Sequence, residues 1–344
     1  MKSRIFALVV GAAATLVALV LASVGGASNQ ATIKVGDVTD IGGLNDHGFN
    51  HLSYTGLQRA KKALKVQTRV YITNSASDRL PNLARAAQSN QLVFGTGFLM
   101  FDSIGKVAKQ YPNVKFVGID IPVDAVPEGR LPNLRGVVFK EQEAGYLVGY
   151  IAGLEIKRHP YKGKQVVAAV GANKVPAIVR FLAGYRAGAK KANAKVKVHL
   201  VYANDPTFSD QAKCKETTLN EIGRGAGVVF EAAGGCGLGG LNAAKQKHVW
   251  GIGVDADQSY LGPHILTSAT KKVDVGVYDT IKAYKANPRG FRGARDVTFS
   301  VKNNGVGYGK LSSRLSRADR AYITKRANAI KKLIAQGKIK PPAK

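Results

Sequence analysis

Short apolar runs rich in β-branched residues alternate with amphipathic stretches along most of this chain. The series begins with an expected strand at residues 31–38 and an expected helix at residues 49–64, and it continues to Asp120. From about residue 140 it restarts and runs to Asp255. Because alternating strands and helices favour parallel sheets, two consecutive series predict an α/β fold with two doubly wound parallel-sheet lobes.

The length and composition are compatible with two lobes. A chain of 344 residues can hold two domains of ordinary size. Its hydrophobic fraction of 45% and charged fraction of 21% are typical of a folded globular protein, so a disordered chain is excluded as a class.

Residues 1–28 have the pattern of a secretory signal peptide. Lys2 and Arg4 precede an apolar run of about 20 residues, and the small residues at 26–28 offer a cleavage point. The run is long for a signal, so an uncleaved membrane anchor is the alternative. We therefore predict an exported protein at the extracytoplasmic face of the cell membrane, in the periplasm or at the cell surface.

The chain has two cysteines, Cys214 and Cys236. Neither follows the apolar run, where a lipid-anchored protein would need one, so we expect a protein that is not lipid-anchored through a cysteine. In an exported protein the pair can form a disulfide. Two separate thiols are the alternative, because the sequence does not give the distance between them.

The chain is strongly basic, with 51 Lys and Arg, 22 Asp and Glu, and a formal net charge of +29. A field of this sign favours anionic partners such as nucleic acid, lipid headgroups or acidic envelope polymers. The strongest local bias lies near the C-terminus, where apolar positions from Leu315 to Leu333 have helical spacing. We interpret this segment as a surface helix with a solvated basic face.

One acidic segment interrupts this basic chain. Residues 36–50, GDVTDIGGLNDHGFN, place three aspartates, Asp40 and Asp46 among them, ahead of Phe49. Asn45 or Asp46 can cap the helix expected from Phe49, but capping explains only one acid and no aromatic residue. Polar groups that converge on an aromatic ring are typical of small-molecule sites. We therefore predict a wall of a ligand pocket here, with an acidic turn at the sheet edge as the alternative.

Three aspartates, Asp40, Asp120 and Asp255, fall just past expected strands. In doubly wound sheets, ligands bind beyond the carboxyl ends of the strands. The sequence therefore predicts that these carboxylates lie near one ligand.

A glycine-rich segment, AAGGCGLGG at residues 232–240, has the spacing of a dinucleotide-binding loop through Gly235, Gly237 and Gly240. The few residues between Gly240 and the next expected strand are too short for a full crossover helix, and the segment does not lie at the first strand–helix turn. We therefore favour a loop whose backbone amides approach a sugar or base.

A second glycine pattern places Gly145, Gly149 and Gly153 at four-residue spacing within one expected helix. The apolar positions around them are too few to span a membrane, so a membrane dimer motif is disfavoured. We predict that this helix packs closely on a sheet.

Sequence motifs for catalysis are absent. The chain has no nucleophile elbow, P-loop or triad spacing, and His47 and His51 have no third ligand at metal spacing. We therefore expect no catalytic residue, no metal site and no cofactor.

These segments together resemble the basic membrane protein family, the purine-nucleoside-binding components of ABC importers. The resemblance extends from about residue 33 to residue 290 and rests on DVTDIGGLNDHGFN, VGID, VPAIVRFLAGYRAG, AAGGCGLGG, GIGVDADQS and ILTSATKKVDVG. It implies the periplasmic-binding-protein-like type I fold, in which two doubly wound parallel-sheet lobes are joined by a three-strand hinge. The implied hinge crossings lie near residues 139–144, 264–270 and 288–293. The implied parts are an N-terminal lobe at 31–141 plus 268–290, a C-terminal lobe at 142–267 plus 291–310, and a basic C-terminal helix at 311–344.

The resemblance also implies a ligand site. Phe49 and Phe181, one from each lobe, would sandwich a purine ring. Asp40, Asn50 and Asp120 would hydrogen-bond the base edge or the ribose from the first lobe. Asp255 would bond ribose hydroxyls, and Lys271 would neutralise buried carboxylate charge and bond the sugar. The family usually has Asp, Lys and Ser where this chain has Asn45, His47 and Gly48, which removes one hydroxyl contact. The complete predicted set is Asp40, Asp46, Phe49, Asn50, Asp120, Phe181, Gly235, Asp255 and Lys271.

The implied partners are a purine nucleoside and an ABC permease in the membrane, and we expect the protein to be a monomer. Its basic surface can add contacts with anionic envelope polymers or lipids. Two other classes of function stay open. One is an NAD-linked or nucleoside-processing enzyme that uses the loop at 235–240, and the other is a basic surface adhesin or a sugar- or nucleic-acid-binding protein.

Overall fold

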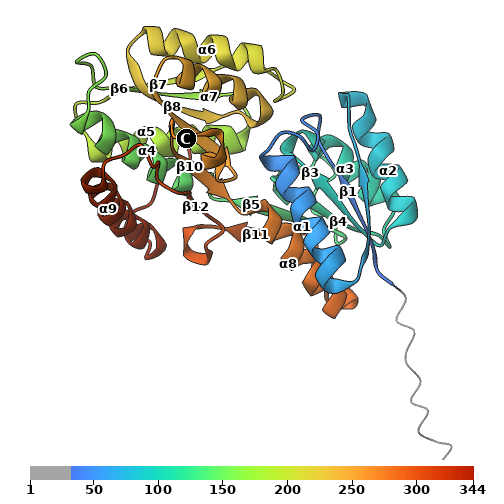
Figure 1. Ribbon diagram of the computed structural model, residues 1–344. Helices are drawn as coiled ribbons and strands as arrows, with labels where there is room; N and C mark the ends of the chain where they lie inside the picture. The colour runs from blue at the N-terminus through green and yellow to red at the C-terminus, as the bar shows by residue number, and fades with distance from the viewer. Residues whose placement is uncertain (1–31) are drawn as a thin grey trace, which may run out of the picture. The chain divides into compact units, whose positions relative to one another are not determined.

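The computed structural model describes residues 32–344, which form two six-stranded sheets flanked by helices (Figure 1). The predicted signal peptide at residues 1–28 lies outside the described residues. Each sheet consists of parallel strands, with one exception described below, and each has helices between its successive strands. The predicted fold class, two doubly wound α/β lobes, is therefore confirmed.

The first lobe contains a wholly parallel sheet in the order β11-β5-β4-β3-β1-β2. Its helices include α8, which packs beside α1. The strands are β1 (Lys34–Val38), β2 (Gln67–Tyr71), β3 (Leu92–Thr96), β4 (Lys115–Ile119), β5 (Leu134–Phe139) and β11 (Arg295–Phe299). The helices are α1 (Phe49–Leu64), α2 (Arg79–Ser89), α3 (Phe101–Gln110) and α8 (Val273–Ala286).

The second lobe contains the sheet β12-β10-β9-β8-β6-β7, in which only β12 is antiparallel to its neighbour. Its last helix, α9, packs against α4. The strands are β6 (Val166–Gly171), β7 (Lys197–Tyr202), β8 (Ala226–Ala232), β9 (Trp250–Asp255), β10 (Ile265–Lys271) and β12 (Val306–Tyr308). The helices are α4 (Glu141–Arg158), α5 (Pro176–Ala192), α6 (Gln211–Gly223), α7 (Gly237–Gln246) and α9 (Arg317–Ala335).

Between residues 32 and 344 the chain crosses between the two sheets three times. The crossings lie at Lys140 between β5 and α4, at Lys272 between β10 and α8, and at residues 300–305 between β11 and β12. They are bonded to one another, because the amide of Lys140 donates to the carbonyl of Phe299 at 2.8 Å and that of Lys272 to the carbonyl of Gly305 at 2.9 Å. The lobes are therefore joined by three adjacent segments.

Two of the predicted crossings are displaced in the structure. Residues 264–270 and 288–293 were expected to cross, but β10 continues to Lys271 in the second sheet, and the last crossing follows β11. As a result, residues 268–271 belong to the second lobe and β11 belongs to the first, the reverse of the predicted division. Apolar alternation identifies a strand but not the sheet that it joins, which is why the boundary was misplaced.

Helices α4 and α5 pack backbone to backbone through the repeated glycines. A Cβ atom at Gly145 would overlap the carbonyl oxygen of Phe181, and one at Gly149 would overlap that of Tyr185. Helix α4 does pack on the second sheet, against β10 and β12, as predicted, but its glycine face meets another helix rather than the sheet. A row of small residues permits close approach to any backbone, and its spacing does not identify the partner.

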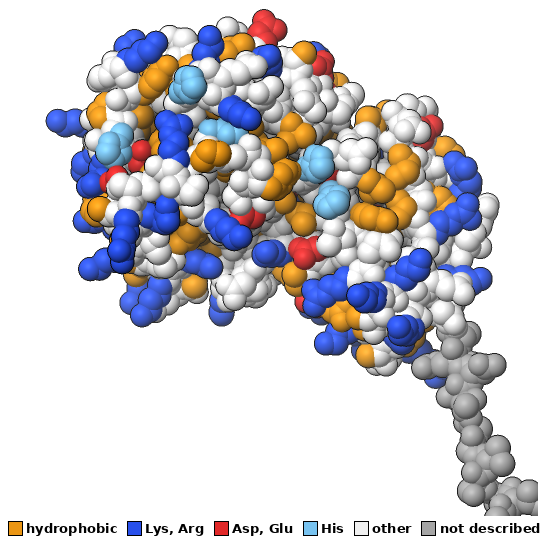
Figure 2. All heavy atoms as spheres, in the orientation of Figure 1, with side chains coloured by type: hydrophobic (Ala, Val, Ile, Leu, Met, Phe, Trp, Pro, Cys, Tyr) orange, Lys and Arg blue, Asp and Glu red, His pale blue; other side chains and the backbone are white. Residues whose placement is uncertain are grey.

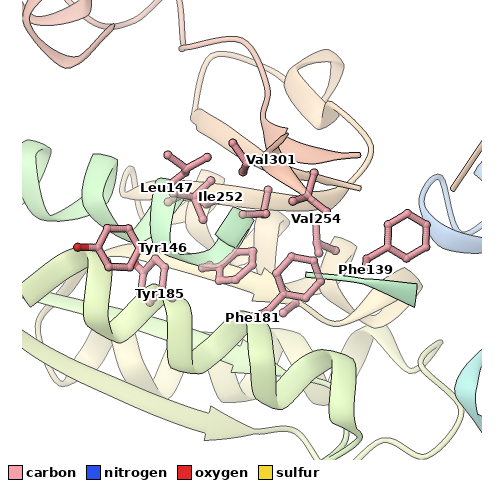
Figure 3. Packing of buried hydrophobic residues seen from close by; sticks show 14 of the residues in the cluster. Phe139, Tyr146, Leu147, Phe181, Tyr185, Ile252, Val254 and Val301 are labelled. Atoms are coloured by element: carbon pink, nitrogen blue, oxygen red, sulfur yellow. The ribbon is translucent and has the colours of Figure 1, made fainter. Parts of the chain in front are cut away.

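The core around this helix pair holds α5 in place beneath the strand ends. Buried apolar side chains from α4, α5, β9 and the crossings pack together there (Figure 3). Phe181 is only 1% exposed and meets the ring of Phe230 edge-on at 5.9 Å between centroids. Because α5 is fixed on both sides, the side chains at its N-terminal half have defined positions.

Lys and Arg side chains are distributed over both lobes on the face that Figure 2 shows, in keeping with the net charge of +29. None of the helices described between residues 32 and 344 has the length and apolar character needed to cross a membrane.

Candidate functional site

A pocket lies between the two lobes, at the carboxyl ends of the strands of both sheets. Every residue that the sequence predicted as a ligand contact lines it. The first lobe contributes Asp40, Asp46, Phe49, Asn50 and Asp120, and the second contributes Phe181, Gly235, Asp255 and Lys271. The predicted set therefore forms one continuous lining, to which the structure adds Gly97, Phe98, Leu99, Ile178, Thr207 and Phe208.

Asp46 fixes the start of α1. Its carboxylate accepts hydrogen bonds from the backbone amides of Gly48 at 3.0 Å, Asn50 at 2.7 Å and His51 at 3.0 Å. These amides at a helix N-terminus have no intrahelical partner, and a carboxylate there also favours the helix dipole. Asp46 is therefore a capping residue, which holds Phe49 at the pocket wall.

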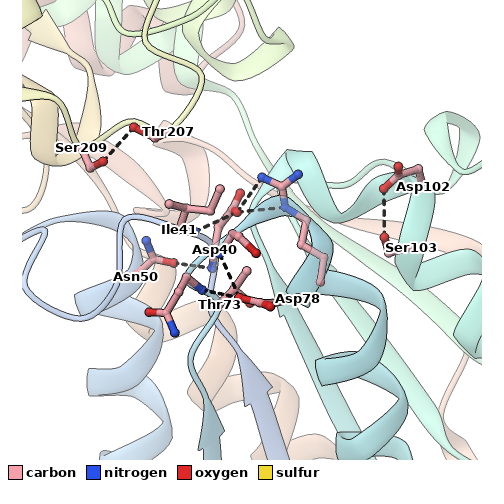
Figure 4. A network of polar contacts seen from close by, with 12 residues as sticks. Asp40, Ile41, Asn50, Thr73, Asp78, Asp102, Ser103, Thr207 and Ser209 are labelled. Atoms are coloured by element: carbon pink, nitrogen blue, oxygen red, sulfur yellow. Dashed lines mark hydrogen bonds and ion pairs between the residues drawn. The ribbon is translucent and has the colours of Figure 1, made fainter.

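Asp40 is held by a residue that the sequence did not single out. The Nε and Nη2 atoms of Arg79, at the start of α2, donate to Oδ1 of Asp40 at 3.1 and 3.0 Å (Figure 4). The amide of Asp40 in turn donates to Oδ1 of Asn50 at 3.1 Å. This arrangement neutralises Asp40 and ties the first turn after β1 to both α1 and α2.

A chain of alternating charges leads from two residues of the pocket lining, Asp120 and Lys271, to Glu141 and Arg180 outside the lining. Lys271, the last residue of β10, bonds Oδ2 of Asp120, and its Nζ lies 3.1 Å from Oε1 of Glu141. The other Glu141 oxygen accepts from Nε of Arg180 at 2.6 Å. Glu141 is fully buried, so both cations are needed to compensate its charge.

Sequence reasoning identified Asp120 and Lys271 but missed Glu141 and Arg180. Glu141 begins an expected helix and Arg180 precedes Phe181, which was the available signal. In the sequence, neither residue can be told apart from a charged residue on the exposed face of a helix. Only the contact between α4 and α5 brings the two side chains together.

Burial changes the protonation of the pocket acids. It raises the pKa of Asp120 to about 6, against the opposing effect of Lys271. It raises the pKa of Asp255 to about 7, again against Lys271. For Lys271, burial lowers the pKa, but Asp120, Glu141 and Asp255 outweigh burial and raise it. Lys271 therefore stays charged, while the two aspartates titrate near neutral pH.

Asp120 retains capacity to accept a hydrogen bond. Its Oδ1 is buried and has no hydrogen-bond partner among the residues at 32–344. Asp120 and Asp255 both have left-handed backbone conformations, with φ of 65° and 62°, directly at the ends of β4 and β9. Strained conformations of this kind cluster at ligand sites, and an unpaired buried acceptor is costly until a donor reaches it.

Aromatic rings from both lobes lie close to the ammonium group of Lys271. Its Nζ lies 4.9 Å from the ring centroid of Phe49 and 5.9 Å from that of Phe181. The pocket thus combines flat apolar faces with carboxylate acceptors. That combination suits a planar ring compound that carries hydroxyl or N–H donors.

The glycine-rich segment forms the second-lobe wall and is fixed by a disulfide. Gly235 lines the pocket, and Cys236 is bonded to Cys214 of α6 with a Cα–Cα distance of 5.5 Å. The alternative of two separate thiols does not hold in this structure. The bond ties the segment after β8 to α6.

The remaining glycines of this segment are explained by packing. The prediction that the residues after Gly240 are too few for a full crossover helix did not allow for α7, which begins at Gly237 and ends at Gln246. The helix starts inside the glycine run. Because glycine has a low helix propensity, the sequence did not indicate this start. A Cβ atom at Gly240 would overlap the buried side chain of Glu231, whose pKa burial raises to about 8. The spacing of Gly237 and Gly240 therefore accommodates Glu231.

Comparisons with known proteins agree with this geometry. Residues 33–341 match a family described as ABC transporter substrate-binding protein PnrA-like. The chain is 34% identical over 335 residues to the ABC transporter nucleoside-binding protein BmpA of Lactococcus lactis, covering 91% of this chain and 90% of that protein. A solved ABC transporter solute-binding protein from Aeropyrum pernix is 27% identical, with a TM-score of 0.78 over 90% of this chain and 94% of that one.

The comparisons overturn one prediction about location. A relative from Pyrococcus abyssi that is 33% identical over 312 residues, 86% of this chain and 74% of that protein, is named a lipoprotein. The prediction that excluded a lipid anchor is therefore wrong, since it treated the position of the cysteines as decisive.

Proposed function

This chain belongs to the family of PnrA-like ABC transporter substrate-binding proteins, and from that premise we propose that it captures a purine nucleoside between its lobes and delivers it to a membrane permease. The family resemblance predicted from the sequence is confirmed. The observation that carries the proposal is that Phe49 and Phe181, from opposite lobes, line the same pocket beside buried carboxylates and Lys271.

The proposed binding mode assigns one role to each kind of group. The purine ring stacks between Phe49 and Phe181, which contributes about 1–3 kcal/mol per aromatic contact. Asp120 and Asp255 accept hydrogen bonds from the ribose hydroxyls or the base edge, and the buried acceptor of Asp120 gains its missing donor. Lys271 opposes the rise in the pKa values of these carboxylates that burial causes, and so favours their ionised, hydrogen-bond-accepting form.

Ligand binding is proposed to favour the closed arrangement of the lobes. A closed form gains contacts from both lobes and an open form from one, so the ligand shifts the population toward closure. The hinge consists of the crossings at Lys140, Lys272 and residues 300–305. Lys271 and Glu141 directly adjoin two of these crossings, so the buried charges respond to the hinge.

We further propose that the nucleoside is released unchanged. The family consists of transporter substrate-binding proteins. Asp46 and Asp40 are engaged in capping and in the Arg79 ion pair, which supports a binding role for the wall rather than general acid–base chemistry. Conversion of nucleoside to free base during prolonged incubation, followed by chromatography, would contradict this part of the proposal.

A thermal-shift screen of residues 33–344 tests the ligand class. The panel contains inosine, guanosine, adenosine, their free bases, ribose, glucose and NAD. A ligand present at a hundred times its dissociation constant adds about 2.7 kcal/mol of stability, which raises the melting temperature measurably. Stabilisation by nucleosides above that by bases and sugars is expected. Stabilisation by sugars or NAD alone would contradict the proposed ligand.

A further inference from the structure

The acidic residues of this protein lie largely inside it. Of the 22 acidic residues in the sequence, eleven are buried, whereas Lys271 is the one buried Lys or Arg between residues 32 and 344. The exposed surface is therefore more positive than the net charge alone indicates. The buried acids are Asp37, Asp46, Asp120, Glu141, Glu143, Glu155, Asp205, Glu221, Glu231, Asp255 and Asp319.

Helix α9 carries the strongest form of this asymmetry. Asp319 is its only acidic residue, and that side chain is buried and bonded to Nε of Arg158 at 2.8 Å and to the Ser316 hydroxyl at 2.6 Å. No acidic side chain is therefore exposed on α9. In the orientation of Figure 1, blue side chains are prominent at the lower left, where α9 lies (Figure 2). The exposed basic residues of the helix are Arg317, Arg320, Lys325, Arg326 and Lys332.

The outward face of α9 carries no large apolar side chain. Its buried residues, including Ile323 and Ile330, face the lobe. At 3.6 residues per turn, Arg317, Lys325 and Lys332 share the opposite side, about two turns apart. Alanines and one asparagine lie between them on that side. We call this side, defined by Arg317, Lys325 and Lys332, the basic face of α9.

We propose that the basic face of α9 holds this protein against anionic lipid headgroups. The proposal goes beyond ligand capture and does not depend on which ligand the pocket takes. No residue of α9 lines the pocket, so attachment through this face leaves the ligand site accessible. Members of this family serve a transporter in a membrane, so a lipid surface is the polyanion close at hand.

Charge and shape favour a lipid surface over nucleic acid. Single-stranded nucleic acid is bound by exposed aromatic rings set in a basic groove. The aromatic residue of α9, Tyr322, lies instead between the guanidinium groups of Arg158 and Arg326, at 4.7 and 4.5 Å from its ring centroid. The basic face presents point charges along one line, which suits attraction to a planar layer of headgroups.

Vesicle co-sedimentation tests the proposal. Residues 33–344, which form a compact unit by themselves, are mixed with vesicles of phosphatidylglycerol and phosphatidylcholine or of phosphatidylcholine alone. We expect binding to the anionic vesicles only, and we expect it to fall steeply as salt rises from about 50 mM to about 500 mM, because screening shortens the reach of the charges. Absence of binding to anionic vesicles at low salt would overturn the proposal.

A matched pair of triple variants separates the basic face from the overall charge. The variant R317Q/K325Q/K332Q and the control K61Q/K106Q/K109Q, exposed lysines of α1 and α3, remove the same charge. At about 1 kcal/mol per basic residue, the α9 variant should lose roughly tenfold or more in vesicle affinity and the control less than threefold. Equal losses would mean that net charge alone binds, and would overturn the assignment to α9.

Two readouts complete the test. Melting temperature and nucleoside affinity should be unchanged in both triple variants, because neither set of residues lines the pocket. Retention on a DNA column that depends on the same three residues, without vesicle binding, would reassign the basic face to nucleic acid and overturn the lipid proposal.

Discussion

The acidic residues of the pocket form two groups that differ in what already bonds their oxygens. Asp40 and Asp46 bond to groups of their own lobe, the Arg79 guanidinium and the first amides of α1. Asp120 and Asp255 lie beside Lys271, and Asp120 retains an oxygen without a described partner. We therefore expect Asp40 and Asp46, whose oxygens are already bonded, to build the pocket wall. Asp120 and Asp255 are expected to bond the ligand.

The largest effect on stability is expected from substitution of Lys271, the cation beside Asp120 and Asp255. Lys271→Met leaves Asp120 and Glu141 buried without their shared partner, which costs about 3–5 kcal/mol of unfolding free energy. Denaturant unfolding at neutral pH measures this loss. Lys272→Met is the control, because Lys272 is exposed and should change stability by less than about 0.5 kcal/mol. Similar values for the two variants would contradict the role of Lys271.

Substitution of Asp46, an acid of the pocket wall, should lower the stability of the protein rather than its affinity for a nucleoside. Asp46→Ala removes the cap of α1 and should cost about 2 kcal/mol, the upper end of the capping range, because three amides lose their acceptor. Asp210→Ala is the control, because it removes a comparable cap from α6 outside the pocket. It should likewise lower stability and leave nucleoside affinity unchanged. If Asp46→Ala left the melting temperature unchanged and abolished nucleoside binding, the division between wall and ligand acids would fail.

A direct comparison of one acid from each group sharpens the distinction. Asp120→Asn should weaken nucleoside binding roughly tenfold or more, because a hydrogen bond to a charged acceptor contributes about 1.5–3 kcal/mol. Asp40→Asn should cause a smaller loss, since Arg79 already bonds that carboxylate. Calorimetric titration of a nucleoside into each variant measures the two affinities. A larger loss at Asp40 would reverse the proposed roles.

The smallest effect is expected from pH. The pKa values of about 6 for Asp120 and about 7 for Asp255 mean that protons compete with ligand donors for these oxygens. Affinity should therefore rise severalfold between pH 5.5 and 8, a range set by those values, and then level off. Because both pKa values are raised in the folded state, their contribution to stability is greatest at acidic pH and declines as pH rises through 6–7. A flat affinity profile would contradict the assignment.

The sequence predicted the elements that depend on local chemistry. Helix α1 begins at Phe49 and ends at Leu64, as its apolar spacing indicated. The aspartates at the carboxyl ends of β1, β4 and β9 line one pocket between the two sheets, in keeping with where doubly wound sheets bind ligands. What it did not predict depends on contacts between distant residues. Arg79 and Asp40 are 39 positions apart, and Glu141 meets Lys271 only through the hinge.

Contacts between distant residues also explain why β11 and the glycine face of α4 were assigned to the wrong neighbours. The strand at β11 was misplaced because pairing with β5, far earlier in the chain, decides its sheet. The glycines of α4 correctly indicated close packing, but the partner proved to be the carbonyl groups of α5. In both cases local sequence specifies a surface or a strand, and tertiary structure selects its neighbour.

Calorimetric titration of inosine into residues 33–344 and into the Phe181→Ala variant shows whether a nucleoside is held between Phe49 and Phe181. We expect one binding site per chain in the wild type, and binding weakened by roughly tenfold or more in Phe181→Ala, because one of the two stacking faces is lost. Phe291→Ala, a half-buried phenylalanine outside the pocket, should bind as the wild type does. Unchanged affinity in Phe181→Ala, with the fold intact, would contradict a nucleoside held between the two rings.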